Sequence, residues 1–518
     1  MYKPSLKEFL KLSENYNVIP VYKEISADLD TPVSSFLKLK KDAYVFLLES
    51  VAGGENVARY SFLGSRPEVV FQSKGRNISI TYDGASGLCP VKCPKGEKFI
   101  LRYPTLTDPL DELKKFMNHI RAARVAGLPR FFGGFVGYMG YDMVRFFENI
   151  PDKNPDSLQL PDAVFMLTDT VLAFDHVNNT IKIISNVILP PASKELSRDA
   201  KKNVYTRAMI KIEGIHRDLA HQAVLKAKNK KEVYSGRVRS NFRKAGFCSI
   251  VKKAKEYIRK GDIIQVVLSQ RFSVKTKKDP FDIYRDLRRL NPSPYMFFLK
   301  LDTVTLVGSS PEILVQCEQG IARTRPIAGT RARGKTEAQD KVLEQELKRD
   351  TKERAEHLML VDLGRNDLGR IGDPGKVTVN EFMGVERYSH VMHLVSDVTA
   401  QLSKKFDVYD VLRACFPAGT VSGSPKIRAM EIIDELENIK RGPYAGAVGY
   451  FSFSHNMDTC IAIRTVVIKD NTAYVQAGAG IVLDSVPEKE YNESISKARA
   501  LIEAIKAVRR KGGTRRSF

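Results

Sequence analysis

The chain has 518 residues, which is long enough for two or more domains that each bury a hydrophobic core. Its 43% hydrophobic and 28% charged residues are typical of a soluble globular protein, and no apolar run reaches the length of a membrane span. The first residues mix Lys and Glu and contain no apolar signal-peptide core, so we expect a cytoplasmic protein.

The formal net charge of +23 is concentrated between Lys182 and Lys260 and in the final RRKGGTRRSF. Two explanations stay open for the first region: a contact with nucleic acid or a membrane, or a solvated helical connector. Nucleic-acid binding is not expected, because the sequence contains no RNA-binding motif, helix-turn-helix signature or zinc finger. The six cysteines are scattered and form no zinc pattern, which indicates reduced cytoplasmic thiols.

The first part of the chain, residues 1–190, has the pattern of a strand-rich α+β domain. A helix and then a strand are predicted within residues 1–30, and residues 45–48 form an apolar run suited to a buried strand. An amphipathic helix is predicted over 108–126, and an Asn-Asn turn at 178–179 joins two further strands.

A basic helical connector is predicted over residues 191–242, a second domain over 243–510 and a basic tail over 511–518. Strands and helices of the second domain do not alternate in a strict βαβ rhythm, which predicts a largely antiparallel α+β fold and not a Rossmann sheet. One long helix is expected over 336–366, and the PIAGT segment is expected to form a loop that follows a strand.

The most informative stretch, VQAGAGIVLDSVPEKEYNESI, lies near the end of the chain. Gly478–Gly480 is expected to be a loop whose N–H groups can approach an anion closely. Ser485 is expected to cap the following helix, with Glu488 completing a capping box. Glu490 and Glu493 then share one helix face. The stretch is either an anion-binding loop followed by a metal-binding helix, or a tight turn followed by a solvated acidic first turn.

Carboxylates in the predicted helix near residue 350 are candidates for the same metal. Glu353 and Glu356, together with the acids near 490, could surround a hard divalent cation, and a set of oxygen ligands favours Mg²⁺ over Zn²⁺. Each acid alone is equally well explained by a surface salt bridge. Arg464 lies in an apolar strand pattern and must find an anion, whereas His393 fits either a core histidine or an active-site one.

Seven motifs occur in one order and resemble those of the chorismate-utilising enzymes: RTRPIAGTRARG, ERAEHLMLVDLGRNDLGR, YSHVMHLVSDV, CFPAGTVSGSPKIRAMEII, PYAGAVGYF, IAIRT and QAGAGIVLDSVPEKEYNES. The similarity is closest to the family of the large component of anthranilate synthase. It covers residues 248–508, with a weaker match over 45–174. It implies an α+β fold with largely antiparallel sheets in a layered α/β/β/α sandwich, and a strand-rich N-terminal regulatory part.

The resemblance implies that the protein converts chorismate and ammonia to anthranilate and pyruvate, the first committed step of L-tryptophan biosynthesis, with Mg²⁺ as cofactor. It implies a separate glutamine amidotransferase subunit as the source of ammonia, in a heterotetramer of two subunits of each kind. None of the six cysteines lies in the Gly-rich elbow that such a glutaminase needs. Feedback inhibition by L-tryptophan is implied as well.

The resemblance also carries residue roles to matching positions. The catalytic residues are Glu312, which would protonate the leaving C4 hydroxyl, His393 and Thr330. The substrate-binding residues are Gly329, Thr330, Tyr444, Arg464, Gly478, Ala479 and Gly480. The metal ligands are Glu356 and Glu493, with Glu353 and Glu490 beside them. The tryptophan site comprises Glu49, Ser50, Pro294, Tyr295 and Met296, which are alternatively only structural strand ends.

Ala328 distinguishes two related activities. In the related aminodeoxychorismate synthases a lysine commonly stands at this position and attacks C2 as a nucleophile. Alanine cannot do this and leaves room for free ammonia. The sequence therefore favours anthranilate synthesis, with an aminodeoxychorismate synthase component of the folate pathway as the alternative.

Overall fold

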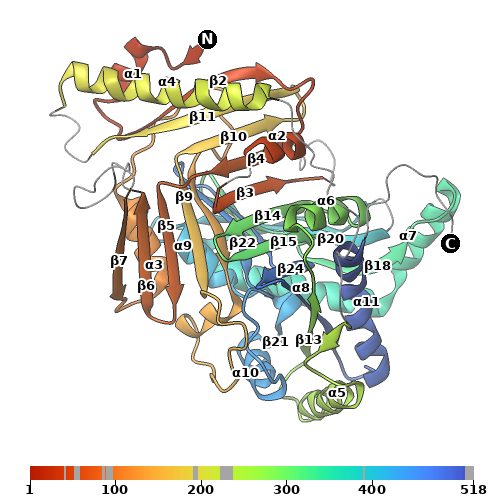
Figure 1. Ribbon diagram of the computed structural model, residues 1–518. Helices are drawn as coiled ribbons and strands as arrows, with labels where there is room; N and C mark the ends of the chain where they lie inside the picture. The colour runs from red at the N-terminus through yellow and green to blue at the C-terminus, as the bar shows by residue number, and fades with distance from the viewer. Residues whose placement is uncertain are drawn as a thin grey trace.

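Two large antiparallel sheets form the framework of the protein. The computed structural model describes residues 1–39, 42–51, 59–83, 88, 97–190, 196–221, 237–388 and 391–507. Within these residues the two sheets stack face to face, and helices cover their outer faces (Figure 1). This arrangement confirms the α+β fold expected from the sequence.

The first sheet has 13 strands in the described residues. The strands are, in spatial order, β1 Tyr2–Lys3, β2 Val18–Ser26, β11 Thr180–Ile188, β10 Thr170–Asp175, β4 Tyr60–Ser65, β3 Tyr44–Glu49, β14 Tyr295–Leu301, β15 Val304–Ser310, β24 Thr465–Lys469, β25 Thr472–Ile481, β13 Gln265–Lys275 and β12 Arg239–Ser240, with β21 Gly423–Ser424 also paired to β13.

The second sheet has 12 strands in the same part of the chain. From one edge to the other they are β18 Ile327–Ala332, β20 Val391–Leu402, β17 Ile321–Thr324, β16 Ile313–Glu318, β23 Met457–Ile461, β22 Ala447–Ser452, β8 Gly134–Met139, β9 Ala163–Thr168, β5 Val69–Lys74, β6 Asn77–Asp83 and β7 Lys98–Pro104, with β19 Gly372–Arg387 also paired to β20.

The helices cover both outer faces of the sandwich. They are α1 Leu6–Leu12, α2 Pro32–Leu39, α3 Pro109–Asn118, α4 Arg198–Ala220, α5 Lys244–Arg259, α6 Pro280–Leu290, α7 Glu337–Arg349, α8 Thr351–Gly369, α9 Val408–Cys415, α10 Lys426–Leu436 and α11 Pro487–Lys506, with short 3₁₀ turns η1 Tyr141–Phe146 and η3 Gly419–Val421. None of the helices in the described residues combines the length and the apolar character needed to cross a membrane.

Side chains that alternate along the strands contribute to two cores: an inner core between the sheets and an outer core under the helices. In β14, Phe297 belongs to the core that includes residues of both sheets, whereas Phe298 packs with the helices on the outer face. Successive side chains of a strand point to opposite faces, so an apolar run such as YMFFLKL fills both layers.

Both sheets join early and late parts of the chain. β3 pairs with β14 in the first sheet, and β8 pairs with β22 in the second. Helix α4, which begins inside the predicted connector, buries Tyr205 and Ile212 in the outer core shared with β2 and β11 (Figure 1). The domain boundaries at residues 190 and 243 stay predictions, and the predicted basic tail over 511–518 lies outside the described residues.

Three local predictions were wrong. The single helix expected over 336–366 is two helices, because Asp350 ends α7 and caps α8 through the N–H groups of Lys352 and Glu353. The expected PIAGT loop is strand β18 with a bulge at Gly329. Helix α11 has Val486 as its N-cap residue, so the predicted capping box does not form.

Candidate active site

Arg464 lies at the centre of the predicted site residues. It occupies the turn between β23 and β24 with a φ of 50°, and not the apolar strand expected from the sequence. The guanidinium donates to the Lys497 carbonyl oxygen at 3.3 Å and forms no ion pair with any described carboxylate. Burial lowers its pKa, while Glu312 and Tyr444 act in the opposite direction. A half-buried cation without an ion-pair partner is suited to an anionic ligand.

The predicted glycine loop is a strand with one open edge. Gly478–Gly480 belongs to β25 and pairs with β13, while β24 pairs with β25 only as far as Val475. In the described residues the other edge of β25 is therefore unpaired from Gln476 to Ile481 and keeps backbone N–H groups available for an anion.

Glycine is required at Gly478 because a backbone carbonyl oxygen leaves no room for a side chain, and at Gly480 a side chain would displace Gln265. A Cβ on Gly478 would lie 3.0 Å from the Tyr444 hydroxyl oxygen and 2.6 Å from the Leu268 carbonyl oxygen. A Cβ on Gly480 would lie 2.6 Å from Gln265 Nε2. The Tyr444 ring and the β25 backbone therefore lie in direct proximity, as the predicted substrate contacts require.

Tyr444 is held by a buried arginine that was not predicted. Arg441 is fully buried, its guanidinium carbon lies 5.5 Å from the centre of the Tyr444 ring, and the guanidinium forms an ion pair with the Glu437 carboxylate at 2.6 Å. The same Glu437 carboxylate accepts hydrogen bonds from the N–H and the hydroxyl of Ser269, whose register partner is Gly478. One buried ion pair therefore positions both the tyrosine and the β13–β25 backbone.

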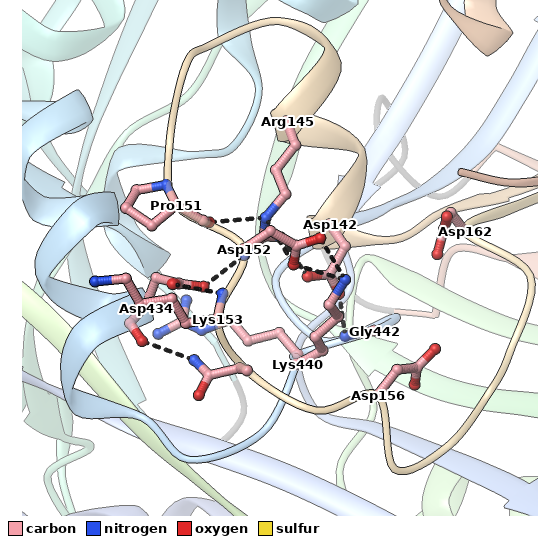
Figure 2. A network of polar contacts seen from close by, with 12 residues as sticks. Asp142, Arg145, Pro151, Asp152, Lys153, Asp156, Asp162, Asp434, Lys440 and Gly442 are labelled. Carbon is pink, nitrogen blue, oxygen red and sulfur yellow. Dashed lines mark hydrogen bonds and ion pairs between the residues drawn. The ribbon is translucent and has the colours of Figure 1, made fainter. Parts of the chain in front are cut away.

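The segment before Tyr444 is also bound from the N-terminal part of the chain. Asp142 accepts from the Gly442 N–H at 2.8 Å, and Arg145 pairs with Asp434 at 2.6 Å (Figure 2). Lys440 pairs with Asp152 at 2.6 Å in the same network (Figure 2). These contacts stabilise the chain segment that leads to Tyr444.

We expect Arg441→Met to lower the free energy of unfolding by about 3–5 kcal/mol, because Glu437 would stay buried without its cation. Urea denaturation followed by far-UV circular dichroism measures this change. The control is Arg428→Met on helix α10, where the more exposed pairs with Asp262 and Glu431 predict a loss of at most about 1 kcal/mol. Equal losses in the two variants would contradict the assigned role of Arg441.

Glu312, the acid predicted from the resemblance, is half-buried and has one hydrogen-bonded carboxylate oxygen. It lies between β15 and β16, and the Thr420 hydroxyl donates to Oε2 at 2.8 Å, whereas Oε1 makes no hydrogen bond with any described residue. Burial raises the pKa of Glu312, while Thr420, Lys497 and Arg464 act against this shift. A carboxylic acid with a raised pKa and one free oxygen is equipped to donate a proton.

His393, Gly329 and Thr330 form one cluster across the β18–β20 pair. His393 Nδ1 lies 2.9 Å from the Gly329 carbonyl oxygen and 3.1 Å from Thr330 Oγ1. Because a carbonyl oxygen only accepts, Nδ1 carries the proton and Nε2 keeps its lone pair. Burial lowers the pKa of His393, which favours the neutral ring. The bulge at Gly329, with a φ of 63°, aims its carbonyl at this histidine.

The predicted metal ligands come from α8 and α11. Glu356 is half-buried, and burial raises its pKa, with Glu353 contributing in the same direction. Gln265 donates to Glu356 at 3.4 Å. Glu353 itself pairs with Arg331 at 3.1 Å. Glu356 is therefore a desolvated carboxylate that a cation would stabilise in its charged form.

On α11, Glu493 is exposed and pairs with Lys497 at 2.7 Å. Burial raises the pKa of Glu490, and the Glu493 charge adds to this effect. Ser485, which does not cap the helix, instead accepts from the Val482 N–H at 3.0 Å. The Lys497 charge acts against the raised pKa of both Glu356 and Glu490, so this lysine lies near acids of α8 and of α11.

The carboxylates near the predicted site are better suited to Mg²⁺ than to a metal that is bound entirely by protein ligands. The described residues contain no cluster of three or more His, Cys, Asp or Glu that could hold a metal. Mg²⁺ needs none, because it keeps several waters and is commonly bound by one or two carboxylates plus an anionic substrate. Two carboxylates such as the predicted Glu356 and Glu493 are donors of this kind.

The five residues expected to bind tryptophan line one cavity of about 70 Å³, and Arg464 is not part of its lining. Met296 and Glu49 are register partners in the β14–β3 pair. The same cavity is lined by Arg130 and Asp458, which pair at 3.2 Å and were not predicted. The only signal in the sequence for Arg130 is an arginine within an apolar segment, LPRFFGG, as for Arg464.

Comparison with known proteins identifies the family of the chain. The chorismate binding enzyme family matches residues 67–503. Anthranilate synthase component 1 of Acetivibrio thermocellus is 47% identical over 98% of this chain and 99% of its own length. The protein of the same name from Aquifex aeolicus is 49% identical over 97% of both chains.

Solved structures place the fold in the same group. Anthranilate synthase component I of Streptococcus pneumoniae has a TM-score of 0.72 and 38% identity, covering 86% of this chain and 92% of that one. The menaquinone-specific isochorismate synthase of Escherichia coli has a TM-score of 0.68 at 19% identity over 96% of this chain and 98% of that one, which indicates a shared fold. The chain therefore belongs to the chorismate-binding enzymes, within the anthranilate synthase component 1 family.

Proposed function

We propose that the protein is the lyase that converts chorismate and ammonia to anthranilate and pyruvate. One observation carries the proposal: the acid Glu312 and the ring of Tyr444 both lie near Arg464. This arginine is a half-buried cation with no described ion-pair partner. Chorismate is a dianion with a poor leaving group at C4, so it needs both cationic contacts and an acid.

In this proposal Arg464, Tyr444 and the open edge of β25 bind the enolpyruvyl carboxylate. Glu312 donates a proton to the C4 oxygen as the C4–O bond breaks, and ammonia adds at C2. Neutral His393, oriented by Gly329 and Thr330, holds its Nε2 lone pair ready to accept a proton in the loss of pyruvate. Mg²⁺ bound by Glu356 and Glu493, beside Glu353 and Glu490, would supply Lewis-acid stabilisation of the ring carboxylate.

Ala328 supports anthranilate over the aminodeoxychorismate alternative. Its methyl group is buried in β18, next to the Gly329 bulge, and offers no nucleophile toward C2. A covalent lysine route is therefore absent at this position, which supports free ammonia as the nucleophile.

Ammonia comes, in this proposal, from a separate glutamine amidotransferase subunit in a heterotetramer in the cytoplasm. The relatives are named as component 1, which supports the need for a second component. In the described residues the free Cys317, Cys415 and Cys460 are buried, and burial raises their thiol pKa values, the opposite of what a glutaminase nucleophile needs.

The test is to incubate the purified chain with chorismate, Mg²⁺ and an ammonium salt at alkaline pH and to record anthranilate fluorescence. Accumulation of aminodeoxychorismate instead would favour the alternative. Omitting Mg²⁺ should abolish the signal, and adding it back should restore it. Salt-sensitive retention on nucleic acid without turnover would reject the enzyme assignment.

We also propose that the cavity lined by Glu49 and Ser50 binds L-tryptophan as a feedback inhibitor. Glu49, which pairs with Arg288 at 3.2 Å, and Arg130, which pairs with Asp458, bring charges of both signs to the same cavity, which suits the ammonium and carboxylate of an amino acid. The aromatic side chains of Tyr60 and Phe62 in the lining suit an indole ring.

Ser50→Phe is expected to weaken tryptophan binding roughly 10- to 100-fold, because a new ring in a filled cavity costs about 1–3 kcal/mol. Ammonia-dependent activity should stay unchanged. The chain has no tryptophan of its own, so the fluorescence of bound L-tryptophan reports binding directly. Ser50→Ala, which adds no volume, is the control, and unchanged inhibition of Ser50→Phe would remove Ser50 from the site.

A further inference from the structure

A cavity of about 50 Å³ borders Glu312 and has no role in the steps described above. Its lining includes Thr420, Thr324 and Asp367, and also half-buried Leu363 near the surface. One water needs roughly 10–15 Å³ of such volume, so the cavity has room for about three to five waters.

Two hydroxyl groups make this cavity suited to water. Thr324 is 8% exposed, and its hydroxyl oxygen has no hydrogen-bond partner among the described residues. A buried hydroxyl without a partner is unfavourable, and a bound water would supply one. The Thr420 hydroxyl donates to Glu312 Oε2 at 2.8 Å, and its oxygen can still accept a hydrogen bond from a water.

The reaction creates two needs at Glu312. The O–H bond of the acid breaks, its proton joins the C4 oxygen, and the oxygen leaves as water with the electron pair of the C4–O bond. The ammonia lone pair forms the new C2–N bond as the ring double bond shifts, and the added nitrogen then loses one proton to solvent. Glu312 is left as a carboxylate that must regain one proton, and one water must depart.

We propose that this cavity is the water site of the reaction, where a short chain of waters from Thr324 to Thr420 removes the released water and returns a proton to Glu312. The inference rests on the proposed function and assigns Thr420 and Thr324 as positioning residues. Ammonia is a poorer occupant, because the cavity is lined by Glu312 and not by Ala328, the residue expected beside C2.

The test uses a glycine of helix α8. A Cβ on Gly364 would lie 3.0 Å from Thr324 Oγ1 and 3.6 Å from Pro326 Cγ, so Gly364→Ala places a methyl group against the unpartnered hydroxyl. Gly369→Ala, at the end of the same helix with nothing within 4 Å, is the matched control. Alanine favours a helix over glycine at both positions, so a loss of activity cannot be assigned to a weaker helix.

We expect Gly364→Ala to lower kcat about tenfold at unchanged KM for chorismate, and to enlarge the solvent isotope effect on kcat, because proton return becomes slower. Thr324→Val should lower kcat similarly, while Thr324→Ser should restore it. This second pair decides the outcome if Gly364→Ala folds poorly. A crystal structure of the unaltered protein should show ordered water bonded to the Thr324 hydroxyl.

Wild-type kcat in both Gly364→Ala and Thr324→Val would overturn the proposal, as would a dry cavity in the crystal. A rise in KM for ammonia alone would identify an ammonia path instead and would also overturn it. These results differ from a failure of the proposed function, in which the wild-type chain itself produces no anthranilate.

Discussion

Glu312→Gln is expected to lower kcat by roughly 10²- to 10⁴-fold at saturating ammonia, the range that a positioned general acid contributes. Glutamine can still accept the hydrogen bond from Thr420 but cannot donate a proton from an acid. Chorismate affinity should therefore change little, because Arg464 and Tyr444 keep their positions. Steady-state anthranilate production and equilibrium binding of chorismate without ammonium measure the two quantities.

The pH dependence gives the same residue a second test. Burial raises the pKa of Glu312, and a general acid must be protonated, so kcat at saturating ammonia should fall as the pH rises through this pKa. This decrease of kcat with rising pH should be absent from the residual activity of Glu312→Gln. A Glu312→Gln variant that keeps both the wild-type kcat and its decrease at high pH would exclude Glu312 as the acid.

Glu493→Gln is expected to abolish turnover at Mg²⁺ concentrations that saturate the wild type. Mutation of groups that merely support a metal ligand typically costs 10- to 100-fold in metal affinity, so removal of a ligand should cost about 100-fold or more. A titration of activity against Mg²⁺ measures the shift. Glu493 is 47% exposed in its side chain and makes one described ion pair, so the fold should be unaffected.

The control for this variant lies near the start of the same helix. Glu488 is also exposed and also pairs with a lysine, Lys244, at 3.3 Å. Glu488→Gln removes an equivalent charge without removing a predicted ligand, so its Mg²⁺ dependence should match that of the wild type. Normal Mg²⁺ dependence in Glu493→Gln would refute the ligand assignment.

Local structure could be predicted where the residues of a short segment determine its conformation by themselves. The turn at residues 178–179 joins β10 and β11 as expected, because Asn179 tolerates the positive φ that the turn requires. The prediction of one helix over 336–366 failed on Asp350. This aspartate stabilises a new helix start that a hydrophobic pattern does not reveal.

The capping box and the glycine loop failed for a different reason. Ser485 and Gly478 both have local alternatives that a sequence cannot rank. The Ser485 hydroxyl accepts from Val482, and Gly478 extends β25 because β13 supplies a full set of pairing partners about 200 residues earlier in the chain. Partners so distant in sequence leave no periodic signal near the residue.

The class of reaction could be inferred from the amino-acid sequence alone. The ordered motifs, which contain Ala328 and Arg464, indicate a chorismate-utilising enzyme, and the resemblance predicts Glu312 as its acid, because a reaction restricts which side chains can perform it. How these residues are held follows from the tertiary structure. Arg441 reaches the Val267 carbonyl at 2.7 Å across 174 positions of the chain, and the water-sized cavity at Glu312 is enclosed by α8, β17 and η3 together. Burial and enclosure are properties of packed elements, so no local pattern contains them.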